Sequence, residues 1–247
     1  LPMIAQHQVT SFFAPPTVWI ALLRSPRFDQ TDLSSLRKGY YGAAIMPVEI
    51  LGELGRRLPN VRFWNLYGQT EIAPLATVLK PEDQIRKAGS AGHPTLNVET
   101  RVVDDDGHPV PPGAIGEIIH RSPHLLQGYY KDQERTATAC EGGWFHSGDL
   151  ATVDDEGYIT IVDRKKEMVL RGGENVYPRE IEEFLYGHPQ IVEVQVIGVP
   201  DAKHGEELCA WVKLRDGEAA TADDIRAYCK GQIAHFKVVQ LNAGNIF

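Results

Sequence analysis

The chain has 247 residues, of which 43% are hydrophobic and 23% charged, the composition of an ordinary folded protein with length for one large domain or two modest ones. Its net charge of -8, with no run of lysine or arginine, argues against a nucleic-acid surface, which needs a basic patch to displace counterions.

The three cysteines, Cys140, Cys209 and Cys229, are scattered and odd in number. This pattern favours reduced thiols over a disulfide framework or a metal cluster. No apolar run approaches the roughly 20 residues that cross a bilayer, and the start lacks the charged-then-apolar layout of a signal peptide. We therefore expect a cytoplasmic protein without a transmembrane segment.

The first 70 residues alternate strand and helix patterns. A strand is predicted over 9–13, a helix over 17–24 after Pro15-Pro16, a helix over 47–58, and an aromatic, β-branched strand over 61–67. Such alternation predicts an open, mostly parallel sheet, in which ligands lie beyond the carboxyl ends of the strands. The small residues Gly42 and Ala43 and the stretch 67–71 both fall at such ends, so we expect them in one crevice.

The stretch 67–71 has the composition of a nucleotide site. Tyr67 offers an aromatic face for a purine, and Gly68 allows a bend close to a ligand. Thr70 can donate its hydroxyl to a phosphate oxygen, and Glu71 supplies the hard oxygen ligand that Mg²⁺ prefers. A strand, a tight turn and a helix start capped by these polar residues would explain the same pattern without a ligand.

Residues 89–162 change to short strands and tight turns. Strands are predicted over 99–103, 116–121, 150–153 and 157–162, with one helical signal over 132–139. This pattern indicates an antiparallel, barrel-like subdomain.

The last part of the chain reads as a small α+β domain. A helix is predicted over 178–186, strands over 191–198 and 207–213, and a further helix after a cap at Thr221. We therefore divide the chain into part of a large α/β subdomain (1–88), a barrel-like subdomain (89–163), a hinge (164–166) and a small C-terminal domain (167–247).

Three motifs carry a family resemblance: YGQTE at 67–71, GWFHSGDL at 143–150, and DRKKEM at 163–168 followed by GGENV at 172–176. In order and spacing they resemble the signature motifs of the adenylate-forming enzymes, which include acyl-CoA synthetases, luciferases and peptide-synthetase adenylation domains. The resemblance runs from residue 1 to about residue 238 and is closest to fatty-acid–CoA ligases. It implies an α/β fold with a partial parallel sheet, a barrel-like subdomain and a small α+β domain, incomplete at both ends.

The resemblance also implies a nucleotide site. Asp149 follows Gly148 at a corner where a carboxylate can accept hydrogen bonds from both ribose hydroxyls, although a surface or cap aspartate would look the same. Arg164 can reach ribose or phosphate with its forked donors. His146 is expected to be structural or pocket-lining, because the substrate carboxylate is already ionised and needs no base. The implied nucleotide-binding residues are Gly42, Ala43, Tyr67, Gly68, Thr70, Asp149 and Arg164; the implied catalytic residues are Thr70, Glu71 and Arg164, with Glu71 as the metal ligand.

Two further sites follow from the resemblance. Lys166 matches the hinge between the two domains of the family, and Gly172, Gly173 and Glu174 match a turn that meets the pantetheine arm of CoA. A glycine turn that serves only a hairpin is the alternative. An acyl pocket is expected at apolar positions that could equally be core, namely Tyr41, Trp64, Ile72, Ala73 and Pro74.

Two usual parts of the family are missing from the sequence. No Ser/Thr/Gly-rich phosphate loop is present, and the pattern ends at Gln240 before the lysine expected near the C-terminus. Lys237 is not a substitute, because it belongs to an ordinary Phe-Lys-Val stretch of the family. We therefore expect a truncated piece with little or no full activity.

The expected function of the parent is an acyl-CoA synthetase that turns a carboxylic acid and ATP into acyl-AMP and then into the CoA thioester. Mg²⁺ is the expected cofactor, ATP and CoA are co-substrates, and the oligomeric state is open. The alternatives are an aromatic-acid CoA ligase of the cinnamate or ferulate type, a non-catalytic AMP- or acyl-binding remnant, or a hydrolase that reuses the pocket. The Gly-x-Ser-x-Gly elbow of esterases is absent.

Overall fold

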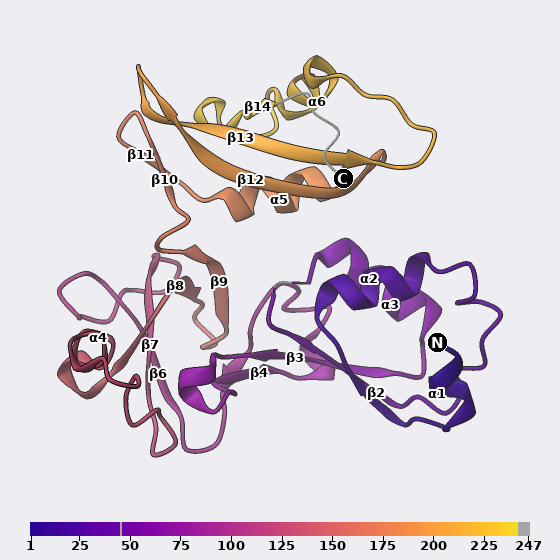
Figure 1. The fold of residues 1–247 in the computed structure, drawn as a ribbon, viewed down its shortest axis with the longest axis horizontal. Helices are drawn as coiled ribbons and strands as arrows, with labels where there is room; N and C mark the ends of the chain where they lie inside the picture. The colour runs from indigo at the N-terminus through magenta and orange to yellow at the C-terminus, as the bar shows by residue number, and fades with distance from the viewer. Residues whose placement is uncertain (45, 242–247) are drawn as a thin grey trace. The chain divides into compact units, whose positions relative to one another are not determined.

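A computed structural model describes residues 1–44 and 46–241, and the chain divides into two compact units, Leu1–Ile161 and Val162–Phe247 (Figure 1). Each unit is described by itself. The end of the expected C-terminal domain, residues 242–247, lies outside the described residues.

The first unit begins with a five-stranded mixed sheet in the order β1-β2-β3-β4-β5. The strands β1 (Ser11–Phe13), β2 (Lys38–Gly42) and β3 (Arg62–Tyr67) are parallel. The short strands β4 (Thr77–Leu79) and β5 (His93–Pro94), which the sequence did not predict, continue the sheet in antiparallel fashion. The expected α/β class with a partial parallel sheet is confirmed.

Two helices, α2 (Pro16–Arg24) and α3 (Val48–Arg57), lie together beside this sheet, and a short α1 (Pro2–Gln6) precedes them (Figure 1). Trp19 of α2 is 1% exposed, and its ring packs edge-on against Phe12 and Phe63, with both centroid distances 5.2 Å. Leu54 of α3 joins the same core. Burial of this aromatic and aliphatic face fixes the helices on the sheet, because each such side chain gains roughly 1.5–3 kcal/mol on leaving water.

An antiparallel sheet follows, in the order β6-β7-β8-β9. Its strands are β6 (Glu99–Val103), β7 (Gly116–Arg121), β8 (Phe145–Val153) and β9 (Ile159–Arg164), and α4 (Gln133–Ala139) is inserted between β7 and β8. Within the described residues these strands form an open sheet and not a closed barrel. β8 begins at Phe145, before the predicted 150, so Asp149 lies within the bounds of a strand. It follows Gly148, which has a φ of 73°, at an irregularity in the pairing with β7 between Glu117 and Ile119.

The two sheets of the first unit are joined around the turn that follows β8. Lys87 Nζ lies 2.5 Å from Asp154 Oδ2 and 2.6 Å from Glu156 Oε1. The Ser90 hydroxyl donates to the Ile159 carbonyl at 2.6 Å in a buried position. These contacts hold the end of the first sheet against the second.

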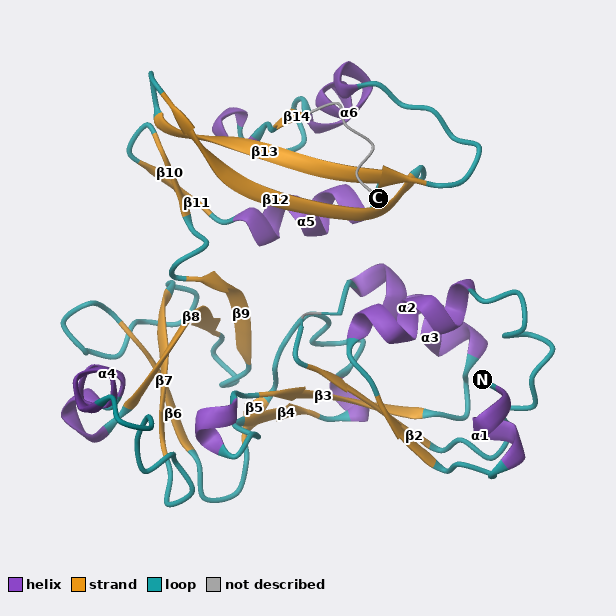
Figure 2. Cartoon of the chain, viewed as in Figure 1, coloured by secondary structure: helices purple, strands orange, loops and turns teal. Residues whose placement is uncertain are grey.

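The second unit is an antiparallel sheet in the order β11-β10-β13-β12, covered by two helices (Figure 2). The unit's helices and strands are β10 (Val169–Arg171), β11 (Glu174–Val176), α5 (Pro178–Tyr186), β12 (Ile191–Asp201), β13 (Gly205–Leu214), α6 (Ala222–Cys229) and β14 (Gln240–Leu241), the last parallel to β13. α6 starts at the predicted cap, where Thr221 and Asp224 exchange hydrogen bonds. None of the described helices combines the length and the apolar character needed to cross a membrane.

His120 is a buried imidazole near the end of β7. Its Nδ1 lies 3.0 Å from Thr100 Oγ1, and its Nε2 is buried without a hydrogen-bond partner in the described part of the chain. Burial lowers the pKa of His120 from 6.5 to about 4. The folded protein therefore keeps this ring neutral at pH values where an unfolded chain would protonate it.

This predicts a pH-dependent stability. Because the pKa of His120 is lower in the folded state than in the unfolded state, the free energy of unfolding falls as the pH drops from about 6.5 to about 4. The full contribution of the shift is about 3 kcal/mol. Urea unfolding at several pH values should show this slope in wild type, a shallower slope in His120→Gln, and an unchanged slope in the exposed control His108→Gln. Equal slopes in His120→Gln and wild type would contradict the assignment.

Candidate nucleotide-binding site

Asp149 is held by two side chains of the YGQTE turn. The Tyr67 hydroxyl donates to Asp149 Oδ2 at 2.8 Å, and Gln69 Nε2 donates to the same oxygen at 3.0 Å. Gln69 Nε2 also donates to the Ser147 carbonyl at 3.0 Å. The Asp149 residue is only 6% exposed, so a carboxylate there needs such donors. The structure thus brings together two of the predicted nucleotide-binding residues, Tyr67 and Asp149, which are 82 positions apart.

Gly68 is required by the path of its own chain. A Cβ at this position would lie 1.9 Å from the Pro74 carbonyl oxygen and 2.8 Å from the Ala76 nitrogen. The Ala76 N–H donates to the Tyr67 carbonyl at 2.8 Å, which closes the turn. The backbone that approaches Gly68 is therefore that of the protein, whereas the sequence suggested a ligand.

Glu71 lies in the short 3₁₀ turn Thr70–Ile72 that follows. The Tyr129 hydroxyl donates to Glu71 Oε1 at 2.9 Å, and the Leu126 N–H donates to the Glu71 carbonyl at 2.8 Å. Among residues 1–44 and 46–241, no hydrogen bond or ion pair to Glu71 Oε2 is formed. The Thr70 side chain is exposed. The predicted phosphate and metal ligands are thus adjacent, and one carboxylate oxygen is already fixed.

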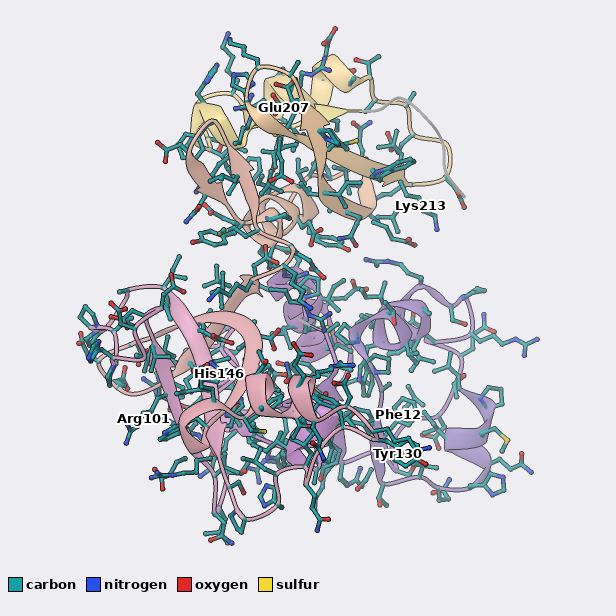
Figure 3. The ribbon with its side chains drawn as sticks, turned by 60° about the vertical axis from the view of Figure 1, so that its left-hand side comes forward. Phe12, Arg101, Tyr130, His146, Glu207 and Lys213 are labelled. Carbon is teal, nitrogen blue, oxygen red and sulfur yellow. The ribbon has the colours of Figure 1, made fainter. Side chains whose placement is uncertain are left out.

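The GWFHSGDL motif is anchored by Glu117 of β7. Glu117 Oε1 accepts the Gly148 N–H at 3.0 Å, and Glu117 Oε2 lies 3.2 Å from His146 Nδ1. The Ser147 hydroxyl donates to the Ile118 carbonyl at 2.5 Å. His146, labelled in Figure 3, is therefore held by Glu117 of the neighbouring strand in the antiparallel sheet.

The expected acyl-pocket residues are spread over core and surface. Tyr41 is 1% exposed, its hydroxyl donates to Gln84 Oε1 at 2.7 Å, and burial raises the pKa of Tyr41. Ile72 is fully buried, while Ala73 and Pro74 are exposed. Trp64 is half-buried and stacks on Tyr40 at 5.1 Å. Tyr41 and Ile72 thus have packing roles that account for their apolar character, and their part in a pocket stays a prediction.

The two small residues at the end of β2 differ in their surroundings. Gly42 is buried, and a Cβ there would lie 2.3 Å from the Leu66 carbonyl oxygen, so the neighbouring strand alone requires glycine. Ala43 is exposed, with a positive φ of 66°. The role of Gly42 and Ala43 in nucleotide binding stays a prediction.

The other predicted residues belong to the second unit. Arg164 is exposed, with Glu167 Oε1 at 3.8 Å from its guanidinium, and Lys166 is exposed as well. Gly172 and Gly173 form the turn of the hairpin β10–β11, which is the structure that the alternative interpretation expected. Glu174 begins β11 and is exposed. The roles of Arg164 at the nucleotide, Lys166 at a hinge and the 172–174 turn at CoA stay predictions.

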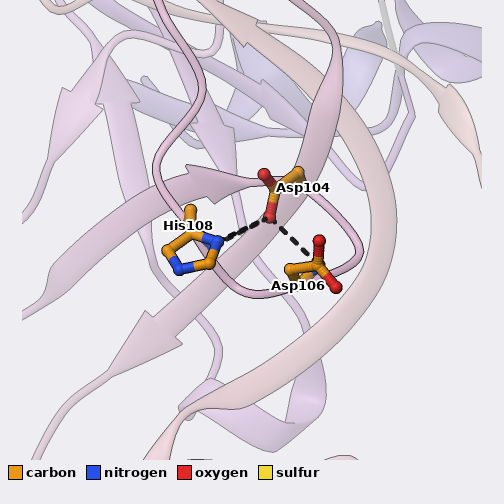
Figure 4. A group of neighbouring side chains, drawn as sticks. All are labelled: Asp104, Asp106 and His108. Carbon is orange, nitrogen blue, oxygen red and sulfur yellow. Dashed lines mark hydrogen bonds and ion pairs between the residues drawn. The ribbon is translucent and has the colours of Figure 1, made fainter.

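A separate polar group lies in the turn between Asp104 and His108 (Figure 4). Asp104 Oδ1 accepts the N–H groups of Asp106 at 3.0 Å and His108 at 2.8 Å. All three residues are exposed. These hydrogen bonds are those of a polar turn, so we assign the group no ligand.

Sequence reasoning missed the partners that hold the predicted residues. Tyr129 contacts Glu71 across 58 positions, and Glu117 contacts Gly148 across 31. Neither contact has a local sequence signal, because each depends on how distant segments pack. Gln69 lies inside a recognised motif, but its side-chain role appears only in the structure.

Comparison with known proteins places the chain in a family. A sequence profile described as "AMP-binding enzyme" matches residues 1–130, and one described as "AMP-binding enzyme C-terminal domain" matches residues 180–243. The chain belongs to the AMP-binding enzyme family. The resemblance to adenylate-forming enzymes drawn from the motifs is thereby confirmed.

Individual members of the AMP-binding enzyme family resemble the chain over nearly its whole length. "Putative acyl-CoA synthetase YngI" of Bacillus subtilis (strain 168) is 42% identical over 241 residues, which are 96% of this chain and 44% of that protein. A feruloyl-CoA synthase of Amycolatopsis sp. is 41% identical over 96% of this chain and 48% of its own length. The chain spans about half the length of these relatives.

A solved structure in the family supports the fold. The o-succinylbenzoate coenzyme A synthetase of Bacillus subtilis, in complex with ATP and magnesium ion, superposes with a TM-score of 0.82 at 30% identity. The match covers 97% of this chain and 48% of that protein.

The Tyr67–Asp149 hydrogen bond yields a stability prediction. Hydrogen bonds to charged groups contribute about 1.5–3 kcal/mol, so Tyr67→Phe should lower the free energy of unfolding by about 2 kcal/mol in urea titrations at pH 7. The control Tyr130→Phe changes the same group at a site that is 87% exposed (Figure 3) and should have an effect below about 0.5 kcal/mol. Equal stability of the two variants would show that the Tyr67 hydroxyl does not support Asp149.

Proposed function

We propose that the protein is an ATP-dependent acid–CoA ligase that activates a carboxylic acid as its acyl-AMP. The observation that carries the proposal is the Asp149 carboxylate, which is held at Oδ2 by Tyr67 and Gln69 next to the turn of Thr70 and Glu71. A fixed, nearly buried carboxylate beside an aromatic ring suits the hydroxyls of a ribose and the base attached to it. The family membership supports an AMP-binding role for this site.

The proposed reaction has two steps. An oxygen of the substrate carboxylate attacks the α-phosphorus of ATP, a new P–O bond forms, and the bond to the β-phosphate bridging oxygen breaks, which releases pyrophosphate. The CoA thiol then attacks the acyl carbonyl, the thiol proton leaves to solvent, and AMP departs. Because the attacking carboxylate is already ionised near pH 7, positioning and charge stabilisation suffice. In the proposal Thr70 contacts a phosphate oxygen of the nucleotide.

A magnesium ion fits the residues present. Glu71 offers a carboxylate whose Oε2 has no partner in the described part of the chain, and Mg²⁺ prefers one or two carboxylates together with substrate phosphates. When bound, the ion would neutralise phosphate charge. Glu71 would hold it.

The acid is proposed to be aliphatic. The support is the 35% identity with a medium-chain acyl-CoA ligase of Rattus norvegicus and the apolar character of Trp64 and Pro74 near the site turn. An aromatic acid is the second candidate, favoured by the similarity to a feruloyl-CoA synthase. Two further parts of the proposal are Lys166 as a hinge residue and Gly172–Gly173 as a contact for CoA.

The nucleotide role of Asp149 is tested by AMP binding. Isothermal titration calorimetry should show Asp149→Ala with AMP affinity at least about tenfold below wild type, a loss of roughly 1.4 kcal/mol, because the ribose loses its acceptor. Asp106→Ala removes a carboxylate from an exposed turn of the same unit and should bind AMP as wild type does. Indistinguishable titrations of Asp149→Ala and wild type would contradict the site.

The choice of acid is tested by binding of non-hydrolysable acyl-sulfamoyl adenosines. We expect an octanoyl or palmitoyl analogue to bind at least about tenfold more tightly than a feruloyl analogue, since an apolar pocket gains roughly 0.8 kcal/mol per buried methylene. Tighter binding of the feruloyl analogue would replace the aliphatic proposal by the aromatic one.

A further inference from the structure

Tyr129 stands out because it contacts the proposed metal ligand and no motif includes it. Its hydroxyl donates to Glu71 Oε1 at 2.9 Å. The backbone of the same loop is tied to Glu71 a second time, since the Leu126 N–H donates to the Glu71 carbonyl at 2.8 Å. The loop before α4 therefore forms hydrogen bonds with both the main chain and the side chain of Glu71.

The position of Tyr129 is itself fixed from α4. The Tyr129 N–H donates to Thr136 Oγ1 at 2.8 Å, and the Thr136 hydroxyl donates to the Asp132 carbonyl at 2.7 Å. The guanidinium carbon of Arg135 lies 4.1 Å from the centre of the Tyr129 ring, within cation–π range. The start of α4 thus fixes the Tyr129 backbone through Thr136 and the face of the Tyr129 ring through Arg135. The Tyr129 hydroxyl extends from this fixed ring to Glu71.

The chemistry of the pair suits a supporting donor. A phenol is protonated at neutral pH, so the Tyr129 hydroxyl can donate to Glu71 Oε1, which lies 2.9 Å away. With Oε1 occupied, the carboxylate cannot rotate freely, and Oε2 is the oxygen without a partner in the described part of the chain. Outer partners of this kind orient metal ligands, and their loss typically lowers metal affinity about 10–100-fold.

We propose that Tyr129 is a positioning residue that orients Glu71 for a divalent cation bound with the nucleotide. The inference rests on the proposed function, in which Glu71 is the metal ligand. The proposal gives the loop before α4 a role in the site. The sequence analysis did not predict the contact between this loop and Glu71.

The test uses Mn²⁺ as a spectroscopic probe. Free Mn²⁺ is measured by electron paramagnetic resonance during titration of the chain in the presence of a non-hydrolysable ATP analogue. Tyr129→Phe keeps the ring under Arg135 and removes only the hydroxyl, so Mn²⁺ affinity should fall about tenfold. Tyr130→Phe, at an exposed neighbour, should leave Mn²⁺ affinity unchanged. Glu71→Gln should abolish the decrease in free Mn²⁺ that is due to binding by the protein. In the Glu71→Gln background, Tyr129→Phe should cause no further loss of Mn²⁺ affinity.

AMP titration by calorimetry without metal separates positioning from general damage. Tyr129→Phe should bind AMP within about twofold of wild type, because Tyr67 and Asp149 are intact. A Tyr129→Phe protein with wild-type Mn²⁺ affinity, while Glu71→Gln loses binding, would overturn the role of Tyr129 alone. Parallel loss of AMP affinity in Tyr129→Phe would also overturn it, because the residue would then be structural. Wild-type Mn²⁺ binding by Glu71→Gln would instead overturn the metal assignment in the proposed function.

Discussion

The first unit depends on one buried carboxylate. Asp149 is only 6% exposed, and a carboxylate removed from water is costly unless hydrogen bonds compensate for the lost hydration. Tyr67 and Gln69, both from the end of the parallel part of the first sheet, supply those bonds to a strand of the antiparallel sheet. The constraint that stabilises Asp149 therefore also joins the two sheets and sets the YGQTE turn beside it.

A second carboxylate repeats this arrangement on the other side of the turn. Glu71 is held at one oxygen by Tyr129, as Asp149 is held at one oxygen by Tyr67. After the turn the chain returns close to Gly68 at Pro74 and Ala76, and a side chain at position 68 would collide with it. This return shapes the turn that carries Glu71 and contacts Asp149 of β8. The site is thus built from three segments, β3 with its turn, β8 and the loop before α4, each fixed by polar contacts with another.

Much of this architecture could be predicted from sequence. The strand over 116–121 and the helix over 178–186 agree with the structure in both bounds, because their periodicity and flanking turn residues are clear. The cap at Thr221 was also correct, since a threonine followed by acidic residues has a local physical signature. The motifs located Tyr67, Glu71 and Asp149, and the structure brings Tyr67 and Asp149 into contact.

The remaining features have no local cause and were missed. β4 and β5 are short and form only because the edge of β3 offers backbone partners. The early start of β8 was missed, because it depends on Phe145 and His146 pairing with His120 and Ile119 of β7. The hydrogen bond from the buried Tyr41 hydroxyl to Gln84 was missed as well. Each of these outcomes depends on tertiary packing between segments that are distant in sequence.

A crystal structure of the 247-residue chain grown with AMP would test the central claim most directly. The account predicts ribose hydroxyls within hydrogen-bonding distance of the Asp149 carboxylate, with the Tyr67–Asp149 and Gln69–Asp149 contacts retained and the phosphate toward Thr70. AMP bound elsewhere, with Asp149 contacting only protein, would contradict it.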